Sequence, residues 1–265
     1  MASLVTLTTD FGTSSGYVAQ MKGTFFQTLY KGTIDNTSRY ADCRLVDLAH
    51  DLAPHDICSA AWFTAASCFD FPPQTLHVIV VDPGVGTRRN IIYAEIADQR
   101  FLAPDNGLLS LAARQHTGTT VRPVQATHPA SKTFHGRDIF APVAAYITLG
   151  QTSCLGKPIE EMLSLPWPEP TALHGSMDGE IIHIDHFGNL ITNLPDTLAR
   201  DLQDLGQLSC DGTPIHNIVS TYGEAKKGTL VGLVGSQGFL EIAVVEGRAD
   251  HHLAARIGTP VRLSK

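Results

Sequence analysis

Four short polar segments of the chain hold the residues whose types and spacing are suited to chemistry. They are TTDFG at 8–12, with Asp10; VVDPGVGTRR at 80–89, with Asp82 and Arg89; TFHGRD at 133–138, with His135; and IDHFGN at 184–189, with Asp185 and Asn189. Carboxylates, an imidazole and a guanidinium can hold a water molecule, move a proton and bind hydroxyl or amino groups of a small substrate. Chemistry is therefore expected at these segments.

Asp82 lies at the end of a run of apolar and β-branched residues, LHVIVV, and Gly84 and Gly86 follow it. A buried strand that ends at a carboxylate and opens into a Gly-rich loop places polar groups at the carboxyl edge of a sheet, where α/β enzymes bind ligands. Arg89 is near enough in sequence to fold back onto Asp82. A glycine turn beside a surface arginine is the simpler alternative. The glycine spacing matches neither GxGxxG nor a Walker loop, so no phosphate site is predicted.

The other segments also have purely structural interpretations. Asp10 is suited to accept hydrogen bonds from a sugar diol, or simply to cap the next segment. His135, before an expected helix, is suited to carry a proton, although a lone histidine in a turn is more often structural. Phe187 is suited to stack on a flat ring and Asn189 to pair with a base edge, but Asp, Gly and Asn also end strands in turns.

The composition limits the classes of function. The 265 residues include 26 acidic and 19 basic ones, giving a net charge of −7 with no basic stripe, so a nucleic-acid binder is not expected. No apolar run reaches the ~18 residues of a membrane span, and the N-terminus lacks a secretory pattern. Five scattered cysteines without a CxxC pair favour reduced thiols in a cytoplasmic protein. Asp185 and His186 lack companions at metal-ligand spacing, so no metal is expected.

The elements expected to position these residues alternate between strand and helix in the first part of the chain. Strands are expected at 4–9, 44–48, 76–82, 90–97 and 101–103, and helices at 17–29, 57–67, 108–114 and 138–150. This alternation favours an α/β domain over residues 1–156, with a largely parallel central sheet and helices on its faces.

The pattern changes at residues 157–174, a Pro-rich and non-helical stretch that we interpret as a connector. Beyond it the signals are almost all β. Strands are expected at 180–184, 229–234, 239–245 and 260–263, the middle two forming a hairpin around the turn at 235–238. Residues 175–265 are therefore predicted to form a smaller, all-β barrel domain.

Six segments taken together resemble one family. They are TTDFG (8–12), VVDPGVGTRR (80–89), APDNG (103–107), TFHGRDIFAP (133–142), IDHFGN (184–189) and GSQGFLEIAV (235–244). In this order they resemble the S-adenosyl-L-methionine (SAM) hydroxide adenosyltransferases, or SAM hydrolases, relatives of the SAM-dependent fluorinase and chlorinase. Each segment alone is a weak signal, but six in the family's order across nearly the whole chain are highly specific.

The resemblance implies an α/β domain followed by a β-barrel, in a homotrimer whose sites lie between subunits. It implies that SAM and water are converted to adenosine and L-methionine, with SAM as the substrate and no further cofactor or metal. The catalytic set of the hydrolases corresponds here to Asp82, Arg89 and His135. The halogenases lack this set, which disfavours halide chemistry.

The resemblance also assigns the substrate contacts by position. It implies that Asp10 holds the ribose hydroxyls, that Asp185 binds the methionine ammonium, and that Ser236 binds its carboxylate. The remaining implied contacts, around the adenosine end, are Phe134, Phe187, Asn189 and Tyr222, together with Glu241 and the backbone near Val244.

The chain departs from the family pattern in three places. The loop after Asp10 reads GTSSGYV, without the acidic residue often found there, so methionine contacts from this loop are in doubt. Gln237 stands where the halogenase has an arginine, and Ile191 replaces a tryptophan. The last two changes are compatible with a hydrolase. Two alternatives remain open: a protein that binds SAM or adenosine with little turnover, and a chlorinase-like transferase.

Overall fold

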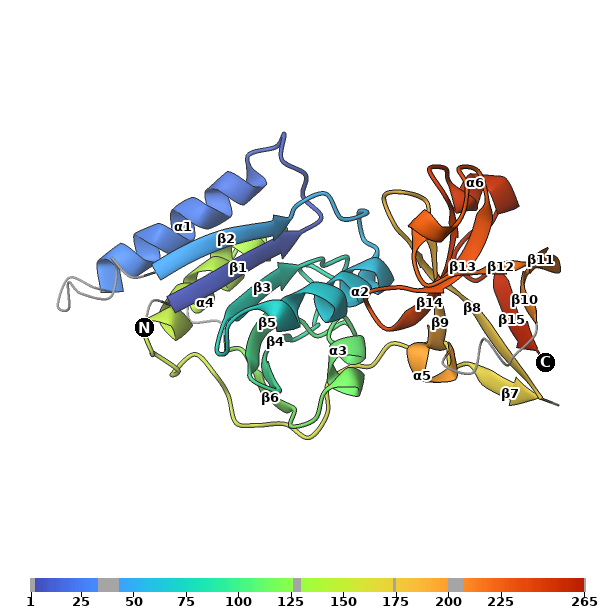
Figure 1. Ribbon diagram of the computed structural model, residues 1–265. Coiled ribbons are helices and arrows are strands. Elements are labelled where there is room, and N and C mark those ends of the chain that lie inside the picture. The colour runs from blue at the N-terminus through green and yellow to red at the C-terminus, as the bar shows by residue number, and fades with distance from the viewer. Residues whose placement is uncertain (1–2, 33–42, 126–129, 174, 200–206, 265) are drawn as a thin grey trace. The chain divides into compact units, whose positions relative to one another are not determined.

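The computed structural model describes residues 3–32, 43–125, 130–173, 175–199 and 207–264. The chain divides into two compact units, Met1–Leu165 and Pro166–Lys265 (Figure 1). Each unit has its own hydrophobic core, so each is described by itself.

The first unit is built on a six-stranded, largely parallel sheet (Figure 1). Its strands are β1 (Ser3–Thr9), β2 (Cys43–Ala49), β3 (Leu76–Val80), β4 (Ile91–Ile96), β5 (Gln99–Pro104) and β6 (Thr120–Pro123). They lie in the order β2-β1-β3-β5-β4-β6, and β4 runs in the direction opposite to the other five strands. The predicted α/β architecture with a largely parallel sheet is confirmed.

Helices cover both faces of this sheet. They are α1 (Tyr17–Gly32), α2 (Ile57–Ser67), α3 (Ser110–Gln115) and α4 (Ala141–Thr148), with the 3-10 turn η1 (Cys68–Asp70) and the π-helical turn η2 (Gly136–Phe140). Alternate residues of β3 face opposite cores: Val78 and Val80 pack with α1 and α4, whereas Ile79 and Val81 pack with α2 and α3. Burial on both faces explains why this stretch is continuously apolar.

The predicted helix at 138–150 is observed in two pieces. A π-helical turn, η2, precedes the regular helix α4, and Pro142 lies in the first turn of α4. A π turn inserts an extra residue into the helical register, and such turns occur frequently at functional sites. Sequence periodicity does not distinguish this turn from ordinary helix.

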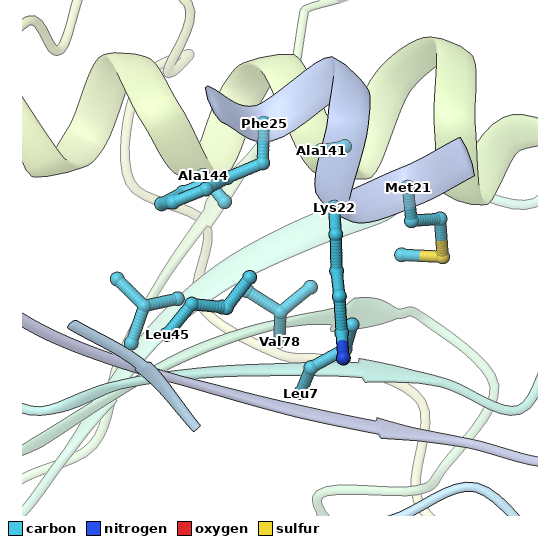
Figure 2. Close-up of a pocket in the computed structure, with 9 residues that line it drawn as sticks. Leu7, Met21, Lys22, Phe25, Leu45, Val78, Ala141 and Ala144 are labelled. Atoms are coloured by element: carbon cyan, nitrogen blue, oxygen red, sulfur yellow. The ribbon is translucent and has the colours of Figure 1, made fainter. Parts of the chain in front are cut away.

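Helix α1 packs through a stripe of residues at helical spacing, Val18, Met21, Phe25 and Leu29, all buried. Figure 2 shows Met21 and Phe25 above the sheet, with Lys22 reaching down toward it. The space that they line has a volume of about 10 Å³, which holds at most about one water molecule. This pocket is a packing gap, so a substrate must bind elsewhere.

The second unit is a nine-stranded, mostly antiparallel sheet. Its elements are β7 (Thr171–Leu173), β8 (Ser176–Ile184), β9 (Leu190–Pro195), β10 (Gln207–Cys210), β11 (Thr213–Ile215), β12 (Asn217–Ile218), β13 (Leu230–Val234), β14 (Phe239–Val244) and β15 (Pro260–Ser264), with helices α5 (Asp196–Ala199) and α6 (Ala249–Leu253) and the 3-10 turn η3 (Tyr222–Glu224). The strand order is β11-β10-β15-β8-β9-β14-β13-β12, with β7 paired to β8.

An irregularity in β8 makes this sheet curl. Before Ile181 the strand pairs with β15, and from Ile181 onward it pairs with β9, with a register shift between Ile181 and His183. Near the two ends of the sheet, β13 and β10 then meet, because a Cβ on Gly232 would lie 2.6 Å from the Leu208 side chain. The predicted smaller β-barrel is confirmed as a nearly closed, barrel-like sheet.

Within the described residues, no helix combines the length and the apolar character needed to cross a bilayer.

His77 is a fully buried polar residue in the middle of the first unit. Its Nδ1 is hydrogen-bonded to Thr6 Oγ1 at 2.8 Å, and its ring stacks on Phe101 with centroids 5.2 Å apart. Burial lowers the pKa of His77 from 6.5 to about 4, because an imidazolium there would lose its hydration. The folded protein therefore keeps this residue neutral at pH values where the unfolded chain protonates it.

We predict that His77 makes the first unit less stable as the pH falls from about 6.5 to about 4. The unfolded state binds the extra proton in this range, so the free energy of unfolding should fall by up to about 3 kcal/mol. Urea unfolding followed by circular dichroism at several pH values measures this slope. His77→Gln should remove most of the slope, and the exposed control His252→Gln should keep it. An unchanged slope in His77→Gln would contradict the prediction.

Candidate active site

Asp10 and Asp82 follow neighbouring parallel strands at the same edge of the first unit's sheet. Strand β1 pairs with β3 in a register that aligns Thr9 with Val80, so the two segments that follow these strands leave the sheet side by side. The carboxyl ends of parallel strands are where α/β proteins gather ligand-binding groups. The expectation that Asp82 lies at such an edge therefore agrees with the observed topology.

Arg89 folds back onto Asp82 and forms a two-point ion pair. Its Nε donates to Asp82 Oδ1 at 2.8 Å, and its Nη2 donates to Asp82 Oδ2. Only 5% of the Asp82 side chain and 10% of the Arg89 side chain are exposed. A fork-shaped pair of this kind fixes the orientation of both groups, because the guanidinium and the carboxylate are each planar.

His135 joins this pair through Arg89. Arg89 Nη2 lies 2.9 Å from His135 Nδ1, and a guanidinium only donates hydrogen bonds, so Nδ1 is the acceptor and the proton is on Nε2. Burial, followed by the charge of Arg89, lowers the pKa of His135, while Asp82 and Asp138 act in the opposite direction. The three predicted catalytic residues thus form one connected group in which the imidazole is neutral.

Gly86 brings the loop of Asp82 against the loop of His135. Its φ is +77°, and a Cβ at this position would lie 2.3 Å from the backbone carbonyl oxygen of Lys132. The absence of a side chain permits such a close approach. The group that approaches Gly86 is another backbone segment, so Gly86 sets the separation of the two loops.

The APDNG segment supports the backbone directly before Asp82. The Asn106 side-chain amide donates to the carbonyl of Val81 at 3.0 Å, and the buried Asp105 carboxylate accepts from the Leu163 amide at 2.8 Å. The Val81 carbonyl thus binds a side chain, and β3 ends just before it, at Val80 and not at 82 as predicted. Sequence reasoning missed this role of Asn106, although an Asn-Gly turn after a strand was the available signal.

Asp10 and Phe134 are linked through Phe11, the residue after Asp10, whose ring packs against Phe134. Asp10 Oδ2 accepts from the His55 amide at 2.9 Å, and the next residue, Phe11, contacts the Phe134 ring with centroids 5.8 Å apart. Tyr17 packs edge-on against Phe134 at 5.1 Å. The first and third sequence segments therefore adjoin each other, and Tyr17 is a neighbour that the sequence did not single out.

In the second unit, Asp185 and Asn189 bind each other. Asp185 Oδ1 accepts from the Asn189 amide at 2.8 Å, and Asp185 Oδ2 accepts from Asn189 Nδ2 at 3.0 Å. One of the two Nδ2 hydrogens of Asn189 is thus engaged inside the turn. The second Nδ2 hydrogen and the side-chain oxygen are the donor and the acceptor that Asn189 could present to a base edge, so that role stays a prediction.

The same turn presents Phe187, whose side chain is 71% exposed. Arg248 supports the turn by donating from Nη1 to the carbonyl of His186 at 3.0 Å and by pairing with Asp250 at 2.8 Å. The carbonyl of Gly188 accepts from the amide of Asp250 at 3.0 Å. Sequence reasoning missed Arg248 and Asp250, because nothing in their own segment indicates a partner about 60 residues earlier.

Tyr222 and Glu241 form a second pair in this unit, in which the Tyr222 hydroxyl donates to Glu241 Oε1. Glu241 is buried, which raises the pKa of its carboxyl group; the hydrogen bond from Tyr222 lowers it, and the charge of Asp185 raises it. Burial and Glu241 also raise the pKa of the Tyr222 phenol. Ser236 is exposed in the turn between β13 and β14, and Val244 is buried at the end of β14.

The predicted residues therefore lie in two groups, one in each unit. Asp82, Arg89 and His135 are in direct contact, and the same unit holds Asp10 and Phe134. The other unit holds the pairs Asp185–Asn189 and Tyr222–Glu241. Across the described part of the chain, no cluster of three or more His, Cys, Asp or Glu side chains is suited to hold a metal ion.

Family comparison covers most of the chain. The profile of the SAM hydroxide adenosyltransferase N-terminal domain matches residues 5–154, and that of the C-terminal domain matches residues 179–262. The chain belongs to the SAM hydroxide adenosyltransferase family. The resemblance that we drew from six sequence segments is therefore confirmed.

Individual relatives of this adenosyltransferase family member cover nearly its full length. A Thermus thermophilus protein named (R)-S-adenosyl-L-methionine hydrolase is 34% identical over 96% of each chain, and one of the same name from Methanocaldococcus jannaschii is 32% identical over 91% of this chain and 88% of its own. A fluorinase from an Actinoplanes species is 26% identical over 91% of this chain and 90% of its own. A crystal structure of an uncharacterized conserved protein from Thermotoga maritima, 30% identical, superposes with a TM-score of 0.87 and covers 99% and 100% of the two chains.

We predict that Gly86→Ala destabilises this adenosyltransferase family member more than Gly118→Ala does. Both glycines have positive φ, +77° and +82°, so both variants incur about 1–2 kcal/mol of backbone strain. Only at Gly86 does the added Cβ also meet a backbone atom, because the space around Gly118 is open. Urea unfolding of the two variants measures the difference. Equal losses of stability would show that the contact with Lys132 does not constrain the loop.

Proposed function

We propose that this protein hydrolyses SAM to adenosine and L-methionine through attack of water on the ribose C5′ carbon. The observation that carries the proposal is the connected group of Asp82, Arg89 and His135 in a member of this family. Relatives that match nearly the whole chain are named SAM hydrolases, and the fluorinases match at lower identity. The C5′–O bond forms as the C5′–S bond breaks, and the electron pair of that bond stays on sulfur.

The leaving group explains why this reaction depends on the nucleophile. Methionine departs from the sulfonium as a neutral thioether, so no proton has to be delivered to it. Water is a poor nucleophile at neutral pH and must approach C5′ in line with the bond that breaks. The protein must therefore supply position and polarisation, which are worth several orders of magnitude when a nucleophile is held in line.

We assign complementary roles to the three contacting residues. Asp82 uses the lone pairs that Arg89 leaves free to accept a hydrogen bond from the attacking water and receives its proton. Arg89 compensates the charge of this nearly buried carboxylate and fixes its direction. His135 cannot accept at Nδ1, which Arg89 occupies, so it offers the Nε2 hydrogen to orient the water.

The two groups of substrate-binding residues suit different parts of SAM. We propose that Asp10 binds the ribose hydroxyls beside Asp82 and that Phe134 packs nearby. In the second unit, Asp185 binds the methionine ammonium and Ser236 its carboxylate. The proposed adenosine contacts are Phe187, Asn189 and Tyr222, with the backbone near Val244. Because Glu241 is buried under the Tyr222 hydroxyl, we propose that it positions Tyr222.

We further propose that the protein is a homotrimer in the cytoplasm, with each site shared between subunits, as the family pattern implies. The exposure of Phe187, at 71%, and of Tyr222, at 43%, supports a binding face that a neighbouring subunit completes. Light scattering of the purified protein should give a mass near three times 28.5 kDa. A mass near that of one chain would contradict both the trimer and the shared site.

The central prediction concerns turnover of SAM by the wild type and by two variants. Incubation with SAM followed by chromatography should yield equal amounts of adenosine and methionine. Asp82→Ala and His135→Ala should each lower the rate at least about 100-fold, because each removes a group that positions the water. Asp98→Ala is the matched control, since Asp98 is exposed in the turn between β4 and β5, away from the Asp82 edge.

The same assay separates the alternatives. Unchanged SAM together with measurable binding would instead indicate a binding protein. Formation of a halogenated adenosine only after addition of halide would indicate a halogenase. Near-normal adenosine release from both variants would overturn the assignment of Asp82 and His135.

A further inference from the structure

Asp138 closes the loop that carries His135. Its Oδ2 accepts from the backbone amide of Ser131 at 2.9 Å, so the two ends of the segment 131–138 are tied together. Inside the segment, Ser131 Oγ accepts from the amides of Thr133 and Phe134, each at 3.1 Å. His135 is thus held in a loop in which two side chains bind three backbone amides.

Arg137 anchors the same carboxylate to the rest of the unit. Its Nε donates to Asp138 Oδ1 at 2.6 Å and its Nη1 donates to Gln20 of α1 at 3.0 Å. Its guanidinium also lies over the Phe134 ring, 5.1 Å from the centroid. The Asp138 side chain is 18% exposed and accepts hydrogen bonds at both oxygens, so its position is strongly determined.

The π-helical turn η2 begins directly after His135 and contains Asp138. The Ala141 amide donates to the Gly136 carbonyl, which closes this wider turn. A Cβ on Gly136 would lie 2.9 Å from Met21 Sδ and 3.3 Å from the Phe11 ring, so the backbone at this point is packed tightly against the aromatic cluster. His135 directly precedes this turn and contacts Arg89, while Asp138, inside the turn, reaches back to Ser131.

We propose that Asp138 is a positioning residue whose carboxylate closes the 131–138 loop, holds His135 Nδ1 against Arg89 and places a negative charge near the imidazole. This inference rests on the proposed hydrolysis for its kinetic consequences, but its structural part is independent of that activity. In this proposal Asp138 does not act directly on the attacking water or on the reacting carbon. It acts through His135, and through the pairing of His135 with Arg89.

The charged groups around His135 set the direction of the expected effect. Arg89 and Asp82 face the ring from the loop after β3, and Asp138 faces it from η2. Burial and Arg89 lower the pKa of His135, whereas Asp82 and Asp138 raise it. Removal of the Asp138 charge should therefore lower the pKa further. Protonation of Nδ1 would oppose the hydrogen of Arg89, so the neutral ring is the active form.

The kinetic experiment compares Asp138→Asn with two matched variants across a range of pH. Asp138→Asn should lower kcat about 10-fold or more, with KM little changed, and should move the acid limb of the pH profile to lower pH. Asp138→Glu keeps the charge and should restore the acid limb. Ser131→Ala loosens the loop without changing any charge, so it should lower kcat and leave the acid limb in place.

A second readout does not depend on turnover. Long-range ¹H–¹⁵N spectra of histidine-labelled protein report the tautomer and the pKa of each ring, and His135→Gln identifies the signals of His135. The wild type should show the Nε2–H form, and Asp138→Asn should show a lower pKa with partial loss of that form. If the wild type does not hydrolyse SAM, the proposed function fails while this measurement still decides the role of Asp138.

Two results would overturn the inference. One is an Asp138→Asn protein whose His135 tautomer and pKa equal those of the wild type. The other is a loss of kcat in Asp138→Asn without any movement of the acid limb, which would make Asp138 a structural residue only. If Asp138→Asn does not fold, Asp138→Glu and Ser131→Ala still separate charge from loop closure, and a shifted acid limb in Ser131→Ala would contradict the assignment.

Discussion

The hydrogen bonds of the Arg89 guanidinium are the interactions on which the rest of the first unit's site depends. The guanidinium occupies both oxygens of Asp82 and the Nδ1 atom of His135, so one planar cation fixes the direction of a carboxylate and the tautomer of an imidazole. Both Asp82 and Arg89 are nearly buried, where an unpaired charge would be costly. The three residues therefore form one connected group, and the orientation of each follows from the other two.

This group requires the loops of Asp82 and His135 to meet, and three features of the fold bring them together. Parallel pairing of β1 and β3 brings their chain ends to one edge of the sheet. Asn106 then holds the last carbonyl before Asp82, while Gly86 lets the Asp82 loop touch the backbone before His135. None of these contacts involves substrate, so much of the sequence that marks the family maintains the geometry of the site.

The sequence predicted the sheet and the pairing of Asp82 with Arg89 because these depend on local patterns: apolar runs, helix spacing and a short loop. It missed the short strands β10, β11 and β12, each four residues or fewer, because hydrophobic alternation cannot be recognised over such lengths. It also missed the support of the 185–189 turn by Arg248, since a contact across 62 residues leaves no periodic trace. For Gly86, a glycine in a turn gives no indication that the backbone at Lys132, 46 residues later, is the group that it approaches.

The hydrogen bonds among Asp82, Arg89 and His135 limit which of these groups can accept a proton from a water molecule. Nδ1 of His135 already accepts from Arg89, and the ring carries its proton on Nε2, so the imidazole in this state is a donor and not a base. Asp82 is then the acceptor toward which a water hydrogen can point, through lone pairs that Arg89 does not use. A sulfonium substrate suits such a site, because its leaving group requires no acid. In the proposed reaction, the proton released from water is the only one that the protein must accept, and we propose Asp82 as the group that accepts it.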